Sequence, residues 1–483
     1  MRGEMAKDFD CIVIGAGIGG LTAAGRLAAR GVKVLVVEKN PVAGGYLQSF
    51  RRRGFTFDAA VDCFSGLDRD GPLSVVLREL GVESMVTPVR VDPIRRSLFP
   101  GLTVDVHASM ERYAEDLKAL FPAESKGIDG LFRAMDAIYS DIMGWCDYCL
   151  GRAASPPLSP EIVRLSGVTF DRFLDEHVSD PKLRGVLADR CPFYGLSPSR
   201  VSAFSMIALV MSYFRSGAYR VAGGSQRLAE AVVEGIRRKG GEVRTGVEAR
   251  RLVTEGGRVK ALCTSEGEEL TARHFISNID YRRTMALAGR EPPDGLPDVS
   301  SSFFILYVGA RMDLARLGRA SSIGSFSDFD MEPDFAPAAP FRPETTFGVT
   351  IPTILDPSMA PPGCHSVVAH EMTSSRWTDS WQRDKAALAR RLLAKVETIV
   401  EGLGAGTVCM DAATPATLER YTANTAGAAY GWSQGPGVRP PEFGLANLRA
   451  AGHWASLGGG VVAAAYAGVN AAREVALALG ADD

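Results

Sequence analysis

Three glycines and one glutamate near the start of the chain have the residue types and the spacing that hold a dinucleotide. Gly15, Gly17 and Gly20 follow the apolar run CIVIG as G-x-G-x-x-G, and Glu38 ends the next apolar run, KVLVVE. Gly15 permits a tight turn, Gly17 lets a diphosphate approach the backbone, and Gly20 lets a helix pack closely on the strand. The carboxylate would accept hydrogen bonds from ribose hydroxyls and repel a 2′-phosphate, which argues against NADP.

Two strands and a helix must position these residues. The unbroken apolar run at residues 11–14 is typical of a parallel strand that is buried on both faces. The Ala- and Leu-rich stretch that follows predicts a helix to about residue 29 that stops at Gly31. The N-terminus of this helix offers free N–H groups and a positive dipole end to phosphates. We therefore assign Ile18 and Gly19 to the cofactor site, with Lys39 beside the glutamate.

A second glycine pair distinguishes FAD from NAD. Gly44 and Gly45 follow the acid, and two strand-like pieces, YLQSF and FTFDAA, flank the turn RRRG. NAD dehydrogenases do not need this feature, whereas the bare backbone of such a doublet lets a flavoprotein approach the diphosphate and ribitol a second time. We therefore predict FAD as the cofactor, and we expect residues 51–53 to form a solvated hairpin tip.

These motifs, together with Ser49-Phe50 and the GFTFD of residues 54–58, resemble the N-terminus of the carotenoid (phytoene) desaturase, carotenoid isomerase and retinol saturase family. The members of that family are FAD-dependent oxidoreductases of polyenes. The resemblance spans nearly the whole chain, with specific motifs at both ends and a looser likeness between them. It implies that Val247 covers the adenine through its backbone and that Asn278 lies near the end of the strand that leaves the FAD domain.

The C-terminal passage ANLRAAGHWASLGGGVVAAAYAGVNAAREVALAL resembles the closing flavin motif of the same family. It predicts a strand that ends at Gly452, a glycine-rich turn that includes Gly459 and Gly460, and a long helix from Val461. The positive end of that helix would stabilise the negative charge of a reduced flavin ring. His453 departs from the family, which usually has an acidic residue there, so we expect the ribitol or diphosphate to be held differently.

We predict an α/β fold, in which a doubly wound, Rossmann-like FAD-binding domain carries an inserted α+β substrate domain. The FAD-binding domain would comprise residues 1–70, 216–290 and 421–483, and the substrate domain residues 71–215 and 291–420. The apolar stretch at 201–214 has three interpretations: domain core, the wall of a lipid tunnel, or a patch that dips into a membrane surface.

Two aromatic residues and two histidines have both a chemical and a structural explanation. Tyr430 and Trp432 are candidates for the substrate side of the flavin, and core packing explains them equally well. His365 and His370 are five residues apart, so in a strand they point to opposite faces and do not converge on a metal. We predict no metal site, and the sequence identifies no general acid or base.

The composition is that of a folded globular protein. Of the 483 residues, 46% are apolar and 23% are charged, and the formal net charge of -2 gives no basis for a nucleic-acid partner. Cys146 and Cys149 form a single CxxC without the further ligands of a zinc site, so we interpret them as small side chains on a helix. We find no signal peptide and no uninterrupted apolar run of about 18 residues, so we expect a cytoplasmic protein, with membrane association left open.

Together these features predict an FAD-dependent oxidoreductase that acts on a long apolar polyene or isoprenoid, as in carotenoid biosynthesis. The reaction would be desaturation, or a flavin-dependent isomerisation or saturation. Because a second G-x-G-x-x-G for NADPH is absent from the sequence, the electron partner would be oxygen, a quinone or another protein. Three alternatives stay open: a flavin amine oxidase with an aromatic pair at the flavin, a prenyl- or lipid-binding carrier of the same fold, and a membrane-scaffolding role through residues 201–214.

Overall fold

The first of two large sheets gathers strands from three separate parts of the chain. In the computed structural model, which describes residues 8–157, 159–336 and 341–481, this sheet has the order β10 (Ala249–Glu255), β11 (Arg258–Thr264), β12 (Glu269–Ser277), β1 (Phe9–Ile14), β2 (Val34–Glu38) and β9 (Glu242–Thr245), and β18 (Leu448–Ala450) also pairs with β12. The strands β9, β2, β1, β12 and β18 are parallel, whereas β10 and β11 form an antiparallel extension of β12.

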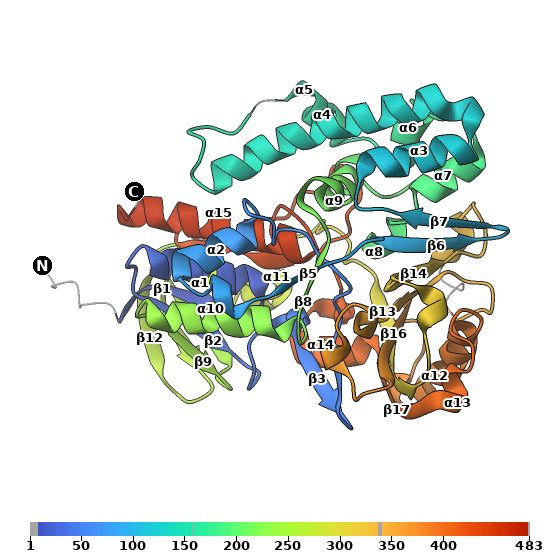
Figure 1. Cartoon of the computed structure of the whole chain (residues 1–483). Helices are drawn as coiled ribbons and strands as arrows, with labels where there is room; N and C mark the ends of the chain where they lie inside the picture. The colour runs from blue at the N-terminus through green and yellow to red at the C-terminus, as the bar shows by residue number, and fades with distance from the viewer. Residues whose placement is uncertain (1–7, 158, 337–340, 482–483) are drawn as a thin grey trace, which may run out of the picture.

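Alternating side chains of this sheet face two different layers, because successive residues of a strand point to opposite sides. Cys11 and Val13 of β1 pack with helices α1 (Ile18–Ala29), α2 (Pro72–Leu80), α10 (Gln226–Arg238) and α15 (Val461–Leu479). Ile12 and Ile14 pack on the other side with α11 (Tyr281–Leu287) and with residues between 428 and 454. Both faces are therefore covered, which explains the unbroken apolar run, and the predicted Rossmann-like α/β fold is confirmed (Figure 1).

The second sheet lies beside the first and belongs to the predicted substrate domain. Its order is β17 (Thr407–Ala413), β13 (Ser302–Arg311), β16 (Cys364–Thr373), β15 (Phe347–Thr350), β14 (Ser322–Ser325), β6 (Arg95–Phe99) and β7 (Leu102–Val106). Phe304 and Leu306 of β13 face a core that includes α12 (Trp381–Glu397) and Leu403 of α13 (Leu403–Gly406). Ile305 and Tyr307, which alternate with them, face the opposite way and pack in a second cluster with Phe55 and Phe57, so this face of the sheet is turned toward the rest of the molecule.

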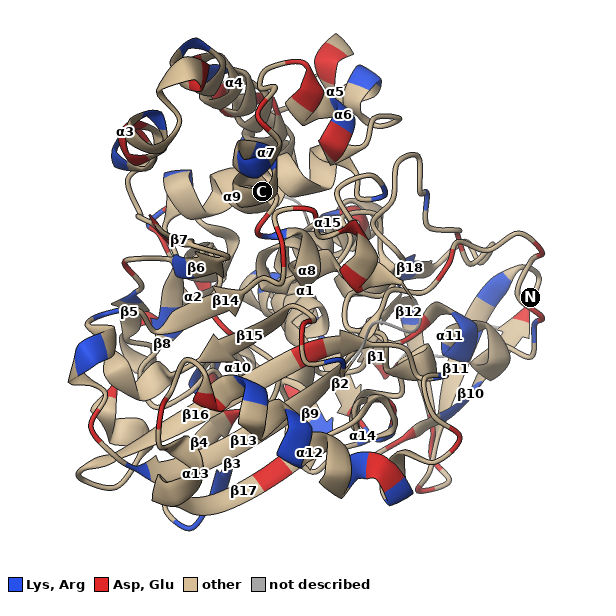
Figure 2. Ribbon diagram, turned by 90° about the vertical axis from the view of Figure 1, so that its right-hand side faces the viewer, with Lys and Arg blue, Asp and Glu red and all other residues tan. Residues whose placement is uncertain are grey.

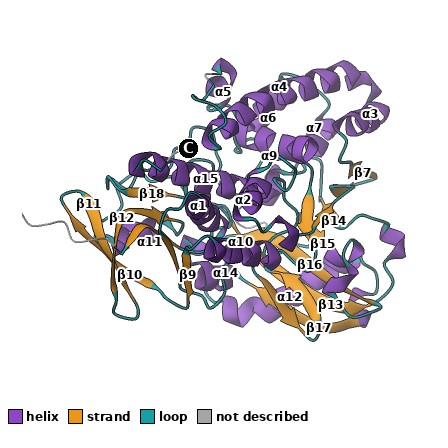
Figure 3. Ribbon diagram, turned by 60° about the vertical axis from the view of Figure 1, so that its left-hand side comes forward, coloured by secondary structure: helices purple, strands orange, loops and turns teal. Residues whose placement is uncertain are grey.

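A further layer of helices lies above the two sheets in the view of Figure 3, where the helices are purple and the strands orange, and α1 and α15 lie between this layer and the first sheet. The layer comprises α3 (Met110–Leu120), α4 (Ser125–Cys149), α5 (Pro160–Leu165), α6 (Phe170–Asp175), α7 (Pro181–Leu187), α8 (Cys191–Tyr194) and α9 (Ala203–Ser216). Smaller elements connect the two sheets: the hairpin β3 (Ser49–Arg52) and β4 (Phe55–Asp58), the pair β5 (Pro88–Arg90) and β8 (Tyr219–Val221), and α14 (Pro415–Thr422). As expected, residues 51–53 are an exposed hairpin tip.

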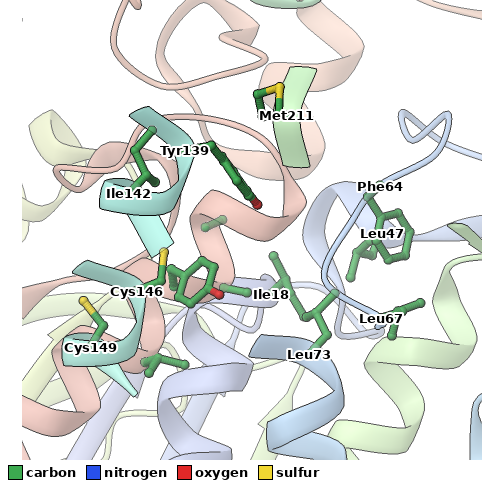
Figure 4. Close-up of a cluster of buried hydrophobic side chains, with 14 of the residues drawn as sticks. Ile18, Leu47, Phe64, Leu67, Leu73, Tyr139, Ile142, Cys146, Cys149 and Met211 are labelled. Atoms are coloured by element: carbon green, nitrogen blue, oxygen red, sulfur yellow. The ribbon is translucent and has the colours of Figure 1, made fainter. Parts of the chain in front are cut away.

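Cys146 and Cys149, in the last turn of the long helix α4, lie in a buried apolar cluster. Figure 4 shows both thiols together with Tyr139 and Ile142 of the same helix and with side chains from α1, α2 and α9. Burial raises the pKa of the Cys146 thiol to about 12, so at neutral pH this thiol is neutral and unreactive. The two cysteines are thus packing residues, and among the described residues no group of three or more His, Cys, Asp or Glu side chains could hold a metal ion.

One described helix, α15, is long and apolar enough to cross a membrane by length and composition alone. More than half of its apolar window is buried inside the protein, where it packs on α1. In α9, which includes most of the apolar stretch 201–214, the one exposed side chain is that of Arg215, and the apolar side chains are buried or half-buried. Acidic and basic residues are interspersed on the outer helices, including α3 and α12 (Figure 2). The domain boundaries given above stay a prediction.

Candidate functional site

A cavity of about 770 Å³ lies between the two sheets and the helical layer. It opens at the carboxyl ends of the parallel strands β1, β2 and β12, where open α/β sheets bind ligands. Most of the predicted cofactor residues line it: Gly15, Gly17, Ile18, Gly19, Glu38, Lys39, Gly44, Gly45, Gly452, His453, Gly459, Gly460 and Val461. Segments from both ends of the chain thus meet at one site, as the sequence predicts.

The two N-terminal glycine motifs form one continuous backbone surface. Gly17 and Gly44 make a parallel bridge, and the Gly44 N–H donates to the Ala16 carbonyl at 2.8 Å. Gly44 has a φ of 128°, a backbone conformation that residues other than glycine rarely adopt. Gly17 is also the N-cap of α1 and has no side-chain cap, so the first N–H groups of this helix stay available to an anionic group.

Glu38 is fixed at the end of β2 by its own neighbours. Its Oε2 accepts from the Ala16 N–H at 2.8 Å, and its Oε1 accepts from the Asn40 N–H at 2.8 Å. Oε1 also accepts from the Asn40 side-chain amide at 2.8 Å, whereas Oε2 accepts only the one bond from Ala16. The carboxylate lines the cavity, so Oε2 can still accept from a ribose hydroxyl. These bonds also tie the first glycine turn to the second strand, which fixes the carboxylate relative to the diphosphate site.

The helices α1 and α15 point their N-termini into the same cavity and pack directly on each other. The Thr22 hydroxyl is 3.2 Å from the Ala465 carbonyl, to which it donates, and a side chain at Gly468 would collide with the Gly19 carbonyl and with Thr22. Gly459 and Gly460 precede α15 and line the cavity without any side-chain cap. Two helix dipoles of the same sign therefore meet at the site, which suits a cofactor that carries a diphosphate and takes up electrons.

Asn278 sits where three glycine segments converge. Its Nδ2 donates to the Gly15 carbonyl at 3.3 Å, and a side chain at Gly17, Gly19 or Gly452 would collide with it. Gly20 does not line the cavity; a side chain there would collide with the Gly15 carbonyl, so its role is the close helix packing that the motif predicts. The lining fits FAD, because it offers uncapped helix ends, glycine backbone and a carboxylate in the order that a dinucleotide requires.

His453 is a neutral group at the wall of the cavity. Burial lowers the pKa of its imidazole to about 4, against the opposing effect of Asp280. The ring lies 5.9 Å from the ring of Tyr46, whose hydroxyl donates to the Ala428 carbonyl at 2.8 Å. A neutral donor and acceptor thus replaces the acid that the family usually has there. The predicted role of His453 toward the ribitol or diphosphate stays a prediction.

The far part of the cavity, which we call the substrate compartment, has a different wall. It is lined by Phe204, Ala208 and Leu209 of α9, by Phe303 and Ile305 of β13, by Val368 and His370 of β16, and by residues 60–65 after β4. The two β13 residues alternate with Phe304 and Leu306, which face the core on the other side of the sheet. This part of the wall belongs to none of the nucleotide motifs, so it leaves room for a second, mainly apolar ligand.

Of the two aromatic candidates, only Tyr430 faces the cavity. It packs against the turn at Gly459 and pairs with the ring of Tyr194 at 5.8 Å. Trp432 does not line the cavity: its side chain is 1% exposed and its indole N–H donates to the Trp454 carbonyl at 3.1 Å, so of its two explanations core packing is the one that holds. Both residues lie in irregular backbone, where no periodicity tells which side a ring occupies.

Val247 is buried beside the nucleotide end rather than in its wall. Its N–H donates to the Glu38 carbonyl at 2.9 Å, and the adjacent residues 248–250 line the cavity. Its predicted contact with adenine stays a prediction.

Sequence reasoning missed two residues of the substrate compartment. Asp62 was given no role, and His370 was interpreted as structural, yet both line the cavity. His370 and His365 do share β16 without converging, as expected, because His365 instead contacts Thr353, with 3.0 Å between its Nδ1 and the hydroxyl oxygen. The available signal was strand parity: His370 has the same parity as Val368, two residues earlier on the same face.

Known proteins resemble this chain in sequence and in fold. Residues 18–293 match the family model of flavin containing amine oxidoreductases. The chain is 28% identical to the chloroplastic prolycopene isomerase of Daucus carota over 98% of this chain and 81% of that protein. It is 25% identical to the all-trans-retinol 13,14-reductase of Macaca fascicularis over 92% of this chain and 81% of that protein. Among solved structures, cyclohexylamine oxidase from Brevibacterium oxydans IH-35A superposes with a TM-score of 0.64 at 17% identity, covering 98% of this chain and all of that one.

The matched segment includes α1, the second glycine pair and the return strand β12, which are the elements that build the nucleotide end of the cavity. The relatives extend the likeness through the C-terminal flavin motif. The chain therefore belongs to the family of flavin-containing amine oxidoreductases, within the group of carotenoid desaturases, carotenoid isomerases and retinol saturases, and is an FAD-dependent oxidoreductase.

Proposed function

We propose that this protein acts on a long apolar polyene or isoprenoid, by desaturation or by flavin-dependent isomerisation or saturation. The observation that carries the proposal is the substrate compartment, which continues the nucleotide site between α9 and the residues of β13 and β16 that line the cavity. The relatives named for prolycopene and for all-trans-retinol act on polyenes of this kind. When bound, FAD would supply hydride transfer, from a carbon of the substrate in desaturation and to a carbon of the substrate in saturation.

The side chains of the compartment suit such a substrate. Phe204 and Leu209 on α9 and Phe303 and Ile305 on β13 form two apolar walls against which a conjugated chain can lie flat. Tyr430 packs on Gly459, so it stands where the compartment meets the flavin motif. Burial raises the pKa of the Tyr430 hydroxyl, so at neutral pH this residue is an uncharged ring that orients the substrate and helps to exclude water.

In this proposal α9 is the wall of a tunnel, the second of the three interpretations of residues 201–214. Its side chains Met206, Ile207 and Met211 are buried in the core, while Phe204 and Leu209 reach the cavity. As further parts of the proposal, electrons pass to oxygen, a quinone or another protein, and the protein works in the cytoplasm. Peripheral membrane contact stays an alternative that vesicle binding would test.

A flavin amine oxidase is the second candidate, because the family model carries that name and an aromatic pair lines the cavity. The pair is Tyr194 and Tyr430, with ring centroids 5.8 Å apart, and not Tyr430 and Trp432. Against this candidate, the carboxylate of Asp62, which lines the cavity, is already paired with the buried guanidinium of Arg220, so it is not left as a free anion for a cationic amine.

Anaerobic titration of the FAD-loaded protein distinguishes the candidates. Loss of the 450 nm flavin absorbance on addition of a reduced polyene would indicate desaturation. A change of isomer, or loss of a double bond, that needs pre-reduced flavin would indicate the other branch. Bleaching by a primary amine, with peroxide released when air is admitted, and no response to any polyene would overturn the proposal in favour of an amine oxidase.

A further inference from the structure

One face of α9 follows the substrate compartment along the helix axis. The residues of this helix that line the cavity come in adjacent pairs that repeat every four positions, which places them on one side of the helix: Phe204, Ser205, Ala208, Leu209, Ser212 and Tyr213. From the first of these residues to the last, the helix rises by about 14 Å. An extended apolar chain that lies against this face can therefore run along α9 for about that length.

The Ser205 end of this face lies beside the flavin motif. The Tyr194 hydroxyl donates to the Ser205 carbonyl at 3.3 Å, and the ring of Tyr194 pairs with that of Tyr430 at 5.8 Å between centroids. Tyr430 in turn packs against the turn at Gly459. A chain along α9 thus has one end near the flavin motif, and Tyr213 lies about 12 Å further along the helix axis.

Tyr213 closes the other end of the face. It is 6% exposed, and its hydroxyl donates to the carbonyl of Cys63, in the loop after β4, at 3.2 Å. It packs in an apolar cluster that includes Val91, Ile94 and Ala218. Because Cys63 also lines the cavity, the tyrosine ring and its hydrogen bond connect α9 to this loop where the compartment ends.

A second, much smaller cavity lies on the other side of Tyr213. Its volume is about 20 Å³, which is room for about one water molecule. Besides Tyr213, its mostly apolar wall includes Ile94, Tyr113, Phe132, Met135 and Phe214. Among the described residues, Tyr213 is the only one that lines both cavities, so its side chain separates them.

The walls of the second cavity do not depend on Tyr213 alone. The ring of Tyr113 is 5.9 Å from that of Phe132 and 5.8 Å from that of Phe214, so these three rings pack on one another across α3, α4 and α9. How far a site collapses after a large side chain is removed depends on such support. We therefore expect the space behind Tyr213 to stay open when its ring is removed, and to join the substrate compartment.

We propose that Tyr213 limits the length of the substrate, because its ring ends the compartment along α9. This inference rests on the proposed function and names the residue that sets the longest chain the protein accepts. Each carbon added to a chain that ends short of Tyr213 buries more apolar surface and strengthens binding. A chain that is longer must displace a buried ring and break its hydrogen bond to the Cys63 carbonyl, which offsets that gain.

The test measures how affinity depends on chain length in the FAD-loaded protein. The ligands are all-trans polyene hydrocarbons that share both end groups and differ in length by one isoprene unit at a time, added from the same detergent micelles. Dissociation constants come from quenching of protein fluorescence and from perturbation of the flavin spectrum. For the wild type we expect the affinity to rise with each added unit until the chain reaches Tyr213, and then to fall.

In Tyr213→Ala the member that binds most tightly should be at least one isoprene unit longer. Its affinity relative to that of the member preferred by the wild type should rise about tenfold or more, as for about two further buried CH₂ groups. Tyr213→Phe keeps the ring and loses only the hydrogen bond to Cys63, so it should keep the length preference of the wild type.

The matched control is Tyr113→Ala. Tyr113 is as deeply buried, at 4% exposed, and it lines the small cavity but not the large one. This variant also loses a buried ring and enlarges the small cavity, yet Tyr213 still separates the two, so its length preference should equal that of the wild type. An equal shift in Tyr113→Ala and Tyr213→Ala would overturn the inference.

If Tyr213→Ala is purified unfolded or without FAD, Tyr213→Leu serves in its place, because its shorter side chain keeps more of the apolar packing and should also shift the preference to longer chains. An unchanged preference in this variant, or loss of FAD from it while Tyr213→Phe keeps FAD, would mean that Tyr213 supports the fold and does not limit length. Failure of every member of the series to bind to the wild type would instead overturn the proposed function.

Discussion

The two ends of the cavity are built from different parts of the chain. At the nucleotide end, backbone forms the surface: Gly17, Gly44 and Gly460 are bare, and two uncapped helices point inward. In the substrate compartment, side chains form the surface, from the apolar residues of α9 to the carboxylate of Asp62, which is paired with the buried Arg220. Backbone recognises groups common to every FAD molecule, whereas side chains can be exchanged without altering the fold. The difference explains how one fold can keep one cofactor and accept different substrates.

The largest expected effect is at the backbone surface. Gly17 lines the cavity, and in Gly17→Val a side chain is added at this wall. Its Cβ alone would be 2.8 Å from Nδ2 of Asn278. The diphosphate could then no longer approach the turn. We expect the variant to be purified without FAD, measured as the ratio of absorbance at 450 and 280 nm.

Gly167→Val is the matched control, because a side chain at Gly167 would meet nothing within 4 Å. It should keep its full flavin content. If Gly17→Val is purified as yellow as the control, the cofactor does not lie against this turn and the division of the cavity into two ends is wrong.

The nucleotide end could be predicted from sequence because its signals are local. Gly15, Gly17 and Gly20 lie within one turn, and Glu38 closes the very next strand, so a short stretch specifies both the shape and its ligand. The C-terminal turn at 458–460 was found in the same way. That the two turns lie close together could be inferred only from the family resemblance. The structure shows that the helices which follow them, α1 and α15, are in contact at Gly19 and Gly468.

The substrate compartment could not be predicted because its polar groups come from distant parts of the chain. Asp62 is held by hydrogen bonds from Arg220, which is 158 residues away in the sequence, and from Ser322, which is 260 residues away. No local pattern reports such a pair. The position of Trp432 could not be predicted for a related reason. In irregular backbone the sequence shows that a residue is aromatic but not on which side its ring packs.

The next largest effect concerns the contact that joins the two chain ends. A side chain at Gly468 on α15 would collide with the Gly19 carbonyl and the Thr22 hydroxyl of α1. Gly468→Val should therefore lower the free energy of unfolding by about 2–3 kcal/mol through overpacking. Chemical denaturation measures it, with Ala478→Val on the exposed side of the same helix as the control, expected within about 0.5 kcal/mol of the wild type. Equal stability of both variants would mean that the helices can separate without cost.

A smaller effect is expected when bulk is added to the side-chain wall. Ala208 lies on α9 and lines the substrate compartment, so Ala208→Trp should narrow the space for a polyene and leave the flavin content unchanged. We expect the KM for a long polyene to rise about tenfold, the effect of 1–3 kcal/mol of overpacking. Val163→Trp, at a position that is 71% exposed on α5, controls for the added indole. A parallel loss of FAD in Ala208→Trp would contradict the separation of the two ends.

The smallest effect is expected at the boundary between the two ends, where His453 lines the cavity beside Tyr46. Because burial lowers the pKa of the folded His453 to about 4, from 6.5, only the unfolded chain takes up this proton as the pH falls through that interval. Stability is therefore fully present above pH 6.5, is lost as the pH falls toward 4 and changes no further below it. The wild type should lose about 1–2 kcal/mol more of its free energy of unfolding over this interval than His453→Phe, since partial exposure to the cavity reduces the full shift. Denaturant titrations at a series of pH values measure the difference. If the free energy of unfolding of the two proteins changes equally with pH, the imidazole titrates normally and can be charged at neutral pH. His453 would then act with the uncapped helix ends as a cation for the diphosphate, and not as a neutral group between cofactor and substrate.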